Sequence, residues 1–177
     1  MEIHAPTAGD LDALVDFFGR VPESERTFFK EPVLDRATVE SWLRADRGRR
    51  GVAVEDGRVT GYVAVVPLPG WSDHVGELRL VVDPDQRGRG LGRDLARWAL
   101  LQALECGLTK LFVEVVAEQD GAVAMFQALG FHAEGLLHDH VRDRNGDLRD
   151  LVLLAHPVAD HWSAMETAGI EDAIGLP

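Results

Sequence analysis

The sequence predicts an α/β sandwich with a mixed β-sheet, and three observations support this prediction. The chain has 177 residues, a length that suits one domain. Runs of β-branched residues alternate with apolar stripes at helical spacing, which indicates strands interleaved with helices. The pairs Asp56-Gly57 and Asn145-Gly146 each separate two extended segments, and such pairs favour the tight turns of β-hairpins.

The N-terminal part predicts one strand and two helices. An extended segment covers residues 3–6, and Thr7 can then cap the free N–H groups of a first helical turn. The apolar stripe of this helix ends at Gly19 and contains Leu11, Leu14, Val15 and Phe18. A second helix fits residues 37–45.

The middle of the chain predicts three strands and a long helix. Residues 52–54 and 59–66 are largely β-branched and lie on either side of the first hairpin turn. Residues 78–82 predict a third strand, which runs into a glycine-rich turn and then into a helix at residues 90–105. The glycines therefore lie between the end of a strand and the start of a helix.

The remaining elements are three strands and one helix. Residues 111–116 carry apolar side chains on both faces, so we expect a central strand that is buried on both sides. One helix is predicted by the stripe Ala122, Met125, Phe126 and Leu129. Strands at residues 133–141 and 148–154 complete a sheet of about seven strands. We expect a single domain over residues 1–156 and a loose tail over residues 157–177.

The chain is acidic, with 30 Asp and Glu against 18 Lys and Arg and a formal net charge of -12. This balance argues against general affinity for nucleic acid or anionic membranes, which attract positive surfaces, and it permits cationic or amine-bearing partners. The single cysteine, Cys106, allows no internal disulfide and is expected to be buried filler. Because no signal-peptide pattern or membrane span is evident, a cytoplasmic location is predicted.

The most specific segment is a run of alternating glycines, Arg87-Gly88-Arg89-Gly90-Leu91-Gly92. Glycine lets the backbone approach a ligand closely, and successive N–H groups at a helix start form an anion-binding concavity. Arg93 and Arg97 add further positive charge on the helix. The segment predicts a site for a phosphate-bearing ligand, and the alternative is a tight turn with solvated arginines. The Walker and dinucleotide spacings of glycine are both absent.

This segment resembles the Arg/Gln-x-x-Gly-x-Gly/Ala signature of the GNAT superfamily, the acyl-CoA-dependent N-acyltransferases. Ala122, Phe126, Gly130 and Phe131 keep the spacing of that family's second segment, Asn-x-x-Ala-x-x-x-Tyr-x-x-x-Gly-Phe. The order of the elements also resembles the family over residues 3–156. The resemblance implies a GNAT-like three-layer sandwich, in which flanking helices cover a mixed central sheet.

The resemblance implies acetyl-CoA, or a related acyl-CoA, as co-substrate. The family's strand residues offer backbone hydrogen bonds to the pantetheine arm, and the matching residues here are Leu80, Val81 and Val82. The pyrophosphate would be held by the glycine-rich turn, namely Arg87, Gly88, Arg89, Gly90, Leu91, Gly92 and Arg93. The pantetheine would lie in a gap where the family splays strand 78–82 from strand 111–116.

Two positions depart from the family pattern. Gln119 stands where an asparagine commonly contacts the pantetheine, and Phe126 stands where a tyrosine often protonates the leaving thiolate. Phenylalanine has no proton to give, and Tyr62, the only tyrosine, lies on an earlier strand. The alternative functions are therefore a non-catalytic acyl-CoA-binding module or sensor, and an enzyme acting on a nucleotide phosphate.

A general base is needed because N-acetylation requires a neutral amine, whereas alkyl amines are mostly protonated near neutral pH. Glu114, in the middle of strand 111–116, is the candidate. It matches the glutamate that serves as base in some protein N-terminal acetyltransferases of the family. Glu77, at the head of the neighbouring strand, is the second candidate. The alternative is a structural glutamate that backbone groups near the splay satisfy.

Two pairs of residues point toward the acceptor side. His138 and His140 are expected on one face of strand 133–141, beside the acceptor site of relatives, without the further ligands that a metal site needs. Phe28 and Phe29 look exposed and either shape the acceptor pocket or anchor a loop. We predict acetyl transfer from acetyl-CoA to a primary amine by direct attack in a ternary complex. The acceptor stays open, as does a homodimer, since relatives often dimerise.

Overall fold

A seven-stranded sheet forms the centre of the computed structural model, which describes residues 1–26, 29–44 and 48–158. The strand order is β1-β2-β3-β4-β5-β7-β6. The strands are β1 (Glu2–His4), β2 (Arg49–Glu55), β3 (Arg58–Pro67), β4 (Val75–Val82), β5 (Lys110–Val116), β6 (His132–Arg142) and β7 (Leu148–Pro157). This sheet confirms the predicted strand content.

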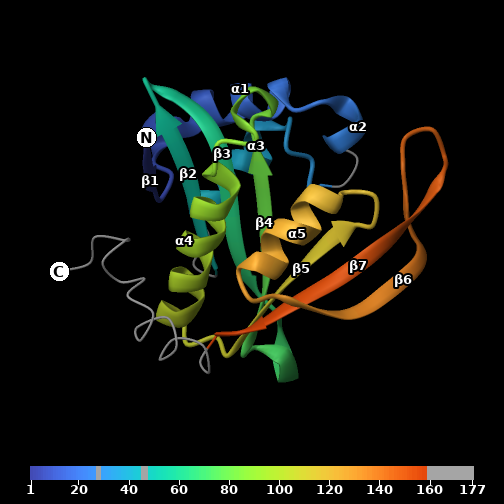
Figure 1. Cartoon of the computed structure of the whole chain (residues 1–177). Coiled ribbons are helices and arrows are strands. Elements are labelled where there is room, and N and C mark those ends of the chain that lie inside the picture. Colours follow the sequence, from blue (N-terminus) through green and yellow to red (C-terminus); the bar gives the residue numbers. More distant parts are fainter. Residues whose placement is uncertain (27–28, 45–47, 159–177) are drawn as a thin grey trace.

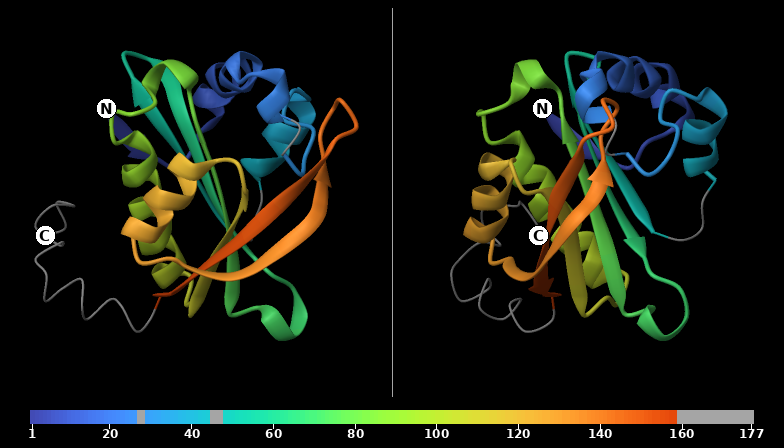
Figure 2. Two further views of the ribbon diagram at one scale, coloured as in Figure 1. Left: turned by 45° about the vertical axis from the view of Figure 1, so that its right-hand side comes forward. Right: turned by 90° about the vertical axis from the view of Figure 1, so that its right-hand side faces the viewer.

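Helices cover both faces of the sheet, which confirms the predicted three-layer sandwich (Figure 1). One face carries α1 (Leu11–Arg20), α2 (Glu23–Arg26) and α3 (Arg36–Trp42). The opposite face carries α4 (Leu91–Glu105) and α5 (Asp120–Ala128). Figure 2 shows the sheet edge-on between these two helical layers, with the β6–β7 hairpin extending beyond α5.

The sheet consists of two antiparallel halves that meet at β4 and β5, the only parallel neighbours among the described strands. These two strands pair only where Val75–Glu77 lies beside Lys110–Phe112. Beyond that point β4 pairs with β3 alone, and β5 pairs with β7 alone. The facing edges therefore part, which confirms the predicted gap between these strands.

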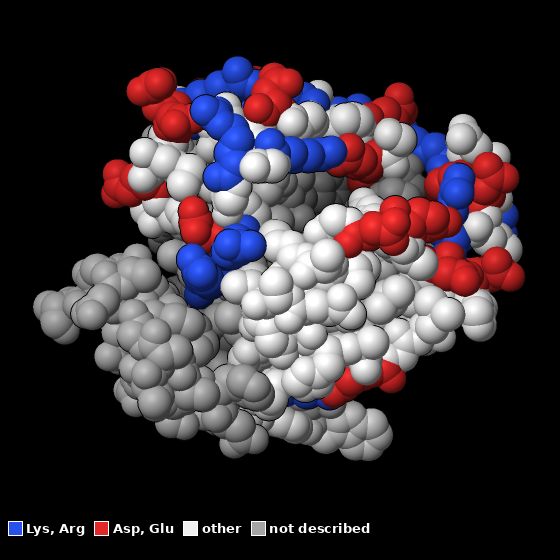
Figure 3. All heavy atoms as spheres, in the orientation of Figure 1, with Lys and Arg blue, Asp and Glu red and all other residues white. Residues whose placement is uncertain are grey.

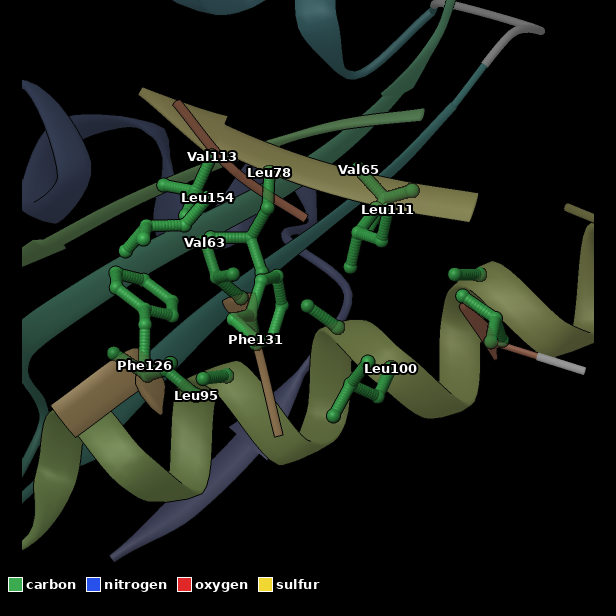
Figure 4. Close-up of a cluster of buried hydrophobic side chains, with 14 of the residues drawn as sticks. Val63, Val65, Leu78, Leu95, Leu100, Leu111, Val113, Phe126, Phe131 and Leu154 are labelled. Carbon is green, nitrogen blue, oxygen red and sulfur yellow. The ribbon is translucent and has the colours of Figure 1, made fainter. Parts of the chain in front are cut away.

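A hydrophobic cluster fixes α4 and α5 against one face of the sheet. Figure 4 shows side chains of α4 directed at the sheet, with Phe126 at one end of the cluster and Phe131 near its middle. Leu95 of α4 and Leu111 of β5 are fully buried in it. At Gly76 the packing leaves no room for a side chain, because a Cβ would lie 2.6 Å from Leu108 Cδ1 and 3.2 Å from Leu111 Cδ1.

A second cluster, rich in aromatic rings, lies under α1 and α3 on the other face. The ring of Phe18 packs edge-on against Trp42, Tyr62 and Phe29, at centroid distances of 5.8, 5.3 and 5.5 Å. Phe29 is therefore half-buried rather than exposed, which corrects the sequence expectation. Its neighbour Phe28 lies outside the described residues.

Several boundaries differ from those that the sequence predicted. Helix α1 continues through Gly19 by one residue and ends at Arg20, and Gly19 is exposed with open space around it. Helix α2 forms between the first two predicted helices, where the sequence predicted no helix. Strand β7 runs on to Pro157, and residues 159–177 of the expected tail lie outside the described part. No helix in the described residues is long and apolar enough to cross a membrane.

Candidate active site

A cleft of about 1370 Å³ opens where β4 and β5 part. The predicted pantetheine residues Leu80, Val81 and Val82 line it from β4, and Val113 and Glu114 line it from β5. The sequence had suggested that strand β5 is buried on both faces. This prediction is wrong, because one face of β5 borders the opening. Figure 3 shows a hollow on this side of the molecule, with basic and acidic side chains gathered along its rim.

The glycine-rich turn forms one end of the cleft. Gly88 and Gly90 have φ values of 73° and 91°, which other residues rarely adopt, and Gly90 directly precedes α4. A Cβ at Gly92 would lie 3.0 Å from the sulfur of Met125 on α5. The cleft is therefore bordered by backbone at the start of a helix, where N–H groups attract anions.

The predicted phosphate-binding residues divide into two groups. The cleft is lined by Arg87, Gly88, Gly90, Gly92 and Arg93. Arg89 and Leu91 are not among the lining residues: the Arg89 guanidinium lies 2.5 Å from Gln86, and the Leu91 side chain is buried in the core. These two could contribute to phosphate binding only through their backbone.

Arg87 already has a partner in the structure. Its two terminal nitrogens contact both carboxylate oxygens of Glu25 on α2, at 2.9 and 2.5 Å. This two-point ion pair joins the glycine-rich turn to α2 across one end of the cleft. Arg97, one helical turn beyond Arg93, pairs with Asp94 at 3.7 Å and does not line the cleft.

Asp83 anchors the segment that leads from β4 into the glycine-rich turn, a role that sequence reasoning missed. Its carboxylate is 2% exposed and accepts hydrogen bonds from Arg20 at 3.1 Å and Arg58 at 2.9 Å. It also accepts a 3.1 Å bond from the backbone N–H of Asp85. Burial alone would raise the pKa of Asp83, but these donors together hold it below the usual value. The Asp-Pro pair that follows β4 was the available sequence signal.

Both candidate bases meet the same ammonium group. Lys30, from the segment between α2 and α3, places Nζ 2.8 Å from Glu77 Oε1 and 2.8 Å from Glu114 Oε2. Glu77 also pairs with Arg79 at 3.0 Å, and Arg79 pairs with Glu31 at 3.1 Å. These five residues, which we call the cleft charge cluster, all line the cleft. Glu114 thus contacts a side-chain ammonium. The alternative from the sequence, a structural glutamate, expected backbone groups as its partners.

The ion pairs of the cluster favour the charged forms of Glu77 and Lys30. Burial opposes the ionisation of Glu77, but hydrogen bonds from Arg79 and Lys30 outweigh it and lower the pKa of Glu77. Burial likewise opposes the charge on Lys30, but its bonds to Glu114 and Glu77 outweigh it and raise the Lys30 pKa. The cleft therefore stabilises a protonated amine between two carboxylates.

A model described as the acetyltransferase (GNAT) family matches residues 14–131, a range that includes the glycine-rich turn and the whole cleft charge cluster. The chain belongs to this family. GNAT proteins are acyltransferases, and acetyl-CoA is the co-substrate that the family uses. The family assignment agrees with the glycine signature and with the gap between β4 and β5.

Relatives of this GNAT protein have several different acceptors in their names. A mycothiol acetyltransferase from Kocuria rhizophila is 32% identical over 120 residues, which cover 61% of this chain and 40% of that protein. The chain thus spans less than half of that relative. The L-amino acid N-acyltransferase MnaT from Escherichia coli is 25% identical over 137 residues, which cover 74% of this chain and 79% of that protein.

Solved structures share the GNAT fold at low sequence identity. A ribosomal-protein-alanine N-acetyltransferase from Brucella melitensis superposes with a TM-score of 0.78 at 24% identity, over 89% of this chain and 99% of that one. The acetyltransferase yncA from Salmonella typhimurium, solved with acetyl-CoA, gives a TM-score of 0.78 at 19% identity, over 89% and 94%. At these identities the likeness supports the fold.

The position at which the resemblance predicts a general acid holds Phe126, which has no proton to donate. Phe126 is buried on α5 and packs against Phe131 with ring centroids 5.2 Å apart. Tyr62 lines the cleft but stacks on Trp42, and burial raises the pKa of Tyr62 to about 12. With this pKa, Tyr62 is a weaker acid than the coenzyme A thiol, whose pKa is near 8.5. It is therefore a poor donor of a proton to the leaving thiolate.

The remaining predicted residues occupy different places in the cleft. Gln119 lines it just before α5, at the position that the family's asparagine takes. A bulge at Asp139, whose φ is 52°, interrupts β6 and separates the two histidines. His138 lies 3.1 Å from Asp150, whereas His140 lines the cleft. Within the described residues, no group of three or more potential ligands could hold a metal ion.

Proposed function

We propose that this protein is an N-acetyltransferase, which transfers the acetyl group of acetyl-CoA to a primary amine of a small molecule or protein. The observation that carries the proposal is that one cleft contains both the glycine-rich turn and the carboxylates of Glu77 and Glu114. The turn suits a pyrophosphate, and the carboxylates suit a cationic amine. Both substrates would therefore meet in a single ternary complex.

The described residues fit the proposed co-substrate. Backbone groups along the parted edge of β4, at Leu80, Val81 and Val82, have no strand partner on the β5 side. Pantetheine carries amides that would give them partners. Gly88 and Gly90 leave room for phosphate oxygens beside the start of α4, and Arg87 and Arg93 supply positive charge.

Proton removal from the acceptor falls to the carboxylate pair. Glu114 is the proposed base, because its side chain remains 23% exposed while that of Glu77 is 8% exposed and already pairs with Arg79. The neutral amine would then attack the thioester carbonyl directly. Backbone N–H groups near Val82 would stabilise the charge that develops on the carbonyl oxygen. Cys106 lies at the far end of α4 and does not line the cleft, so we assign it no nucleophilic role.

The thiolate would leave without a protein acid, since Phe126 has replaced the usual tyrosine. A coenzyme A thiolate is a tolerable leaving group because alkyl thiols have a pKa near 8.5. This chemistry makes transfer feasible but slower than with a positioned acid, which typically contributes about 10²- to 10⁴-fold. A cytoplasmic location is part of the proposal, since one cysteine suits a reducing compartment.

An acceptor panel tests the proposal. Purified protein is incubated with acetyl-CoA and single amines from several classes (amino acids, peptides with free N-termini, polyamines and aminoglycosides), and free thiol release is measured. We expect turnover with at least one class and none without protein. Tight binding of CoA in a thermal-shift assay, with no turnover on any amine, would instead favour the acyl-CoA sensor. Stabilisation by ATP or NAD in place of CoA would overturn both readings.

A further inference from the structure

Lys30 is the only lysine among the described residues that line the cleft. The sequence contains two lysines, Lys30 and Lys110, and all its other Lys and Arg residues are arginines. Lys30 lines the cleft, and its Nζ lies 2.8 Å from Glu114 and 2.8 Å from Glu77. It thus occupies the position where the proposed function requires an acceptor ammonium.

We propose that Lys30 is a self-acetylation site, whose Nζ accepts the acetyl group of acetyl-CoA bound in the same cleft. The inference rests on the proposed function, because it needs the same co-substrate and the same base. Three observations carry it: the contact of Nζ with both carboxylates, a side chain that is 45% exposed, and a cleft shared with Val81 and Val82 of β4. A lysine with its partners outside the cleft would share the exposure alone.

The reaction balances without any further reactant. The Lys30 ammonium transfers one proton to the Glu114 carboxylate, and the freed lone pair attacks the thioester carbonyl carbon. A C–N bond forms, the C–S bond breaks, and coenzyme A leaves as a thiolate. That thiolate takes up a proton from solvent, the Nζ proton displaced on acylation is lost to solvent, and Glu114 returns to its carboxylate form on exchange with water.

The modification would change the cleft charge cluster. Acetylated Lys30 is uncharged, so it would no longer neutralise Glu77 and Glu114. Glu77 would keep its ion pair with Arg79 at 3.0 Å, whereas Glu114 would lose the ammonium that lies 2.8 Å from it. The released Glu114 could then meet the ammonium of an external acceptor. Self-acetylation would therefore prepare the cleft for cationic acceptors.

Lys110 provides a control within the same chain. Its side chain is 38% exposed and pairs with one carboxylate, that of Glu134, at 2.5 Å. Its exposure and charge pairing thus resemble those of Lys30. It lies at the first residue of β5, beside Val75 at the paired end of the strands, and it does not line the cleft. Acetylation by free acetyl-CoA in solution would reach both lysines, whereas transfer within the cleft would reach only Lys30.

The experiment measures acetylation of the two lysines in one sample. Full-length protein is incubated with acetyl-CoA without an acceptor, and peptide mass spectrometry follows the mass of one acetyl group on each lysine. We expect Lys30 to react about a hundredfold faster than Lys110, the lower end of what a positioned base contributes. We also expect a first-order rate that does not change with protein concentration. Equal rates at the two lysines would overturn the inference.

Two variants sharpen the test. Glu114→Gln should slow acetylation at Lys30 and leave the rate at Lys110 unchanged, and Glu134→Gln should not slow acetylation at Lys30. An unchanged Lys30 rate in folded Glu114→Gln protein would overturn the inference. Acceptor turnover is recorded in parallel with the panel above. Turnover without Lys30 acetylation would overturn the inference and leave the proposed function standing, whereas loss of both would overturn both.

Discussion

At the scale of single residues, Glu114 and Lys30 define what the cleft attracts. The carboxylates of Glu77 and Glu114 hold one ammonium group at 2.8 Å from each. An external amine that binds there must either displace Lys30 or meet it in its acetylated, neutral form. If the proposed function holds, these carboxylates would favour acceptors that carry a protonated amine over neutral ones.

Replacing Glu114 with glutamine tests the base directly. The amide keeps the shape of the side chain but cannot take up a proton, so kcat/KM for the acceptor should fall by about 10²- to 10⁴-fold. The dissociation constant for CoA should stay the same, because Glu114 does not belong to the glycine-rich turn. Steady-state kinetics and isothermal titration measure the two quantities. Undiminished turnover would remove Glu114 as the base, and Glu134→Gln serves as the matched substitution outside the cleft.

Two arginines on successive turns of α4 allow a paired test of the phosphate site. Arg93 lines the cleft, whereas Arg97 pairs with Asp94 outside it. Arg93→Ala should raise the dissociation constant for CoA roughly 10- to 100-fold, the usual value of a charge-assisted hydrogen bond. Arg97→Ala should leave it unchanged. Equal effects of the two substitutions in titration calorimetry would indicate a general charge effect instead of a specific contact.

Local patterns predicted some of these residues and missed others. The glycine-rich turn and Glu114 were accessible because their roles depend on spacing within one strand and the turn after it. Lys30 was missed because its role depends on how a charged segment after α2 folds across two strands far away in the sequence. Asp83 was missed for a related reason, since its arginine partners come from α1 and β3.

At the scale of elements, the short contact between β4 and β5 determines where the cleft begins. Only Val75–Glu77 of β4 pairs with β5. Gly76 lies in the middle of this contact, with Leu108 and Leu111 packed where its side chain would be. The end of the cleft is therefore fixed by close packing as well as by strand pairing.

Adding one methyl group at Gly76 tests this packing. Gly76→Ala should lower the free energy of unfolding by about 1–3 kcal/mol, because the buried leucines around it must shift. Gly19→Ala is the control of opposite sign: Gly19 is exposed in α1 with open space around it, and alanine should stabilise the helix by about 0.5–1 kcal/mol. Denaturant unfolding measures both. A Gly76→Ala protein as stable as wild type would show that the strands separate there without cost.

The order and type of the main helices and strands were predictable from the sequence. The short helix, the bulge and the burial of each strand face were less predictable. Strands and long helices are recognised by the spacing of their apolar residues, and each of these was predicted close to its observed range. Helix α2 has only the four residues Glu23–Arg26, too short to show a period. The bulge at Asp139 and the half-exposed face of β5 both follow from contacts with other elements, which no local pattern records.

At the scale of the whole molecule, Asp83 connects elements from both ends of the N-terminal half. Arg20 reaches it from α1 and Arg58 from β3, while Asp83 itself follows β4. Because the pKa of Asp83 is lowered in the folded state, its ionised form stabilises the fold. This contribution is complete above the unfolded pKa, near 3.9, and is lost as the pH falls through the lower folded value.

Asp83→Asn should therefore show a pH-dependent loss of stability. At neutral pH the variant should unfold with about 1–3 kcal/mol less free energy, since two charge-assisted bonds to partly exposed arginines are weakened. The difference from wild type should narrow as the pH falls below about 4, where Asp83 of the unfolded wild type takes up a proton, and should vanish below the lower pKa of folded Asp83. Asp85→Asn, at an exposed carboxylate 4.0 Å from Arg58, should change little at either pH. A pH-independent difference would argue against this ionic role.

The net charge of -12 is spread over a molecule whose cleft contains charges of both signs. Arg87 and Arg93 line one end, and Glu77 and Glu114 line the middle. The overall acidity argued against extended polyanions as partners, and that stays a prediction, but it carried no information on this local arrangement. Two small substrates of opposite charge can share such a cleft, each at its own end.

The short paired segment of β4 and β5 lies at one end of both strands, so a change of angle there moves the far end of β4. Beyond Glu77, β4 extends over five more residues to Val82, a length of about 16 Å. A rotation of about five degrees at the paired end would therefore displace the far end by about 1.4 Å. The glycine-rich turn follows that far end after Asp83 and the short 3-10 helix Pro84–Gln86. Because β3 pairs with β4 over this whole length, such a rotation would carry that half of the sheet with it, and the width of the opening at the turn would depend on the strand angle set around Gly76.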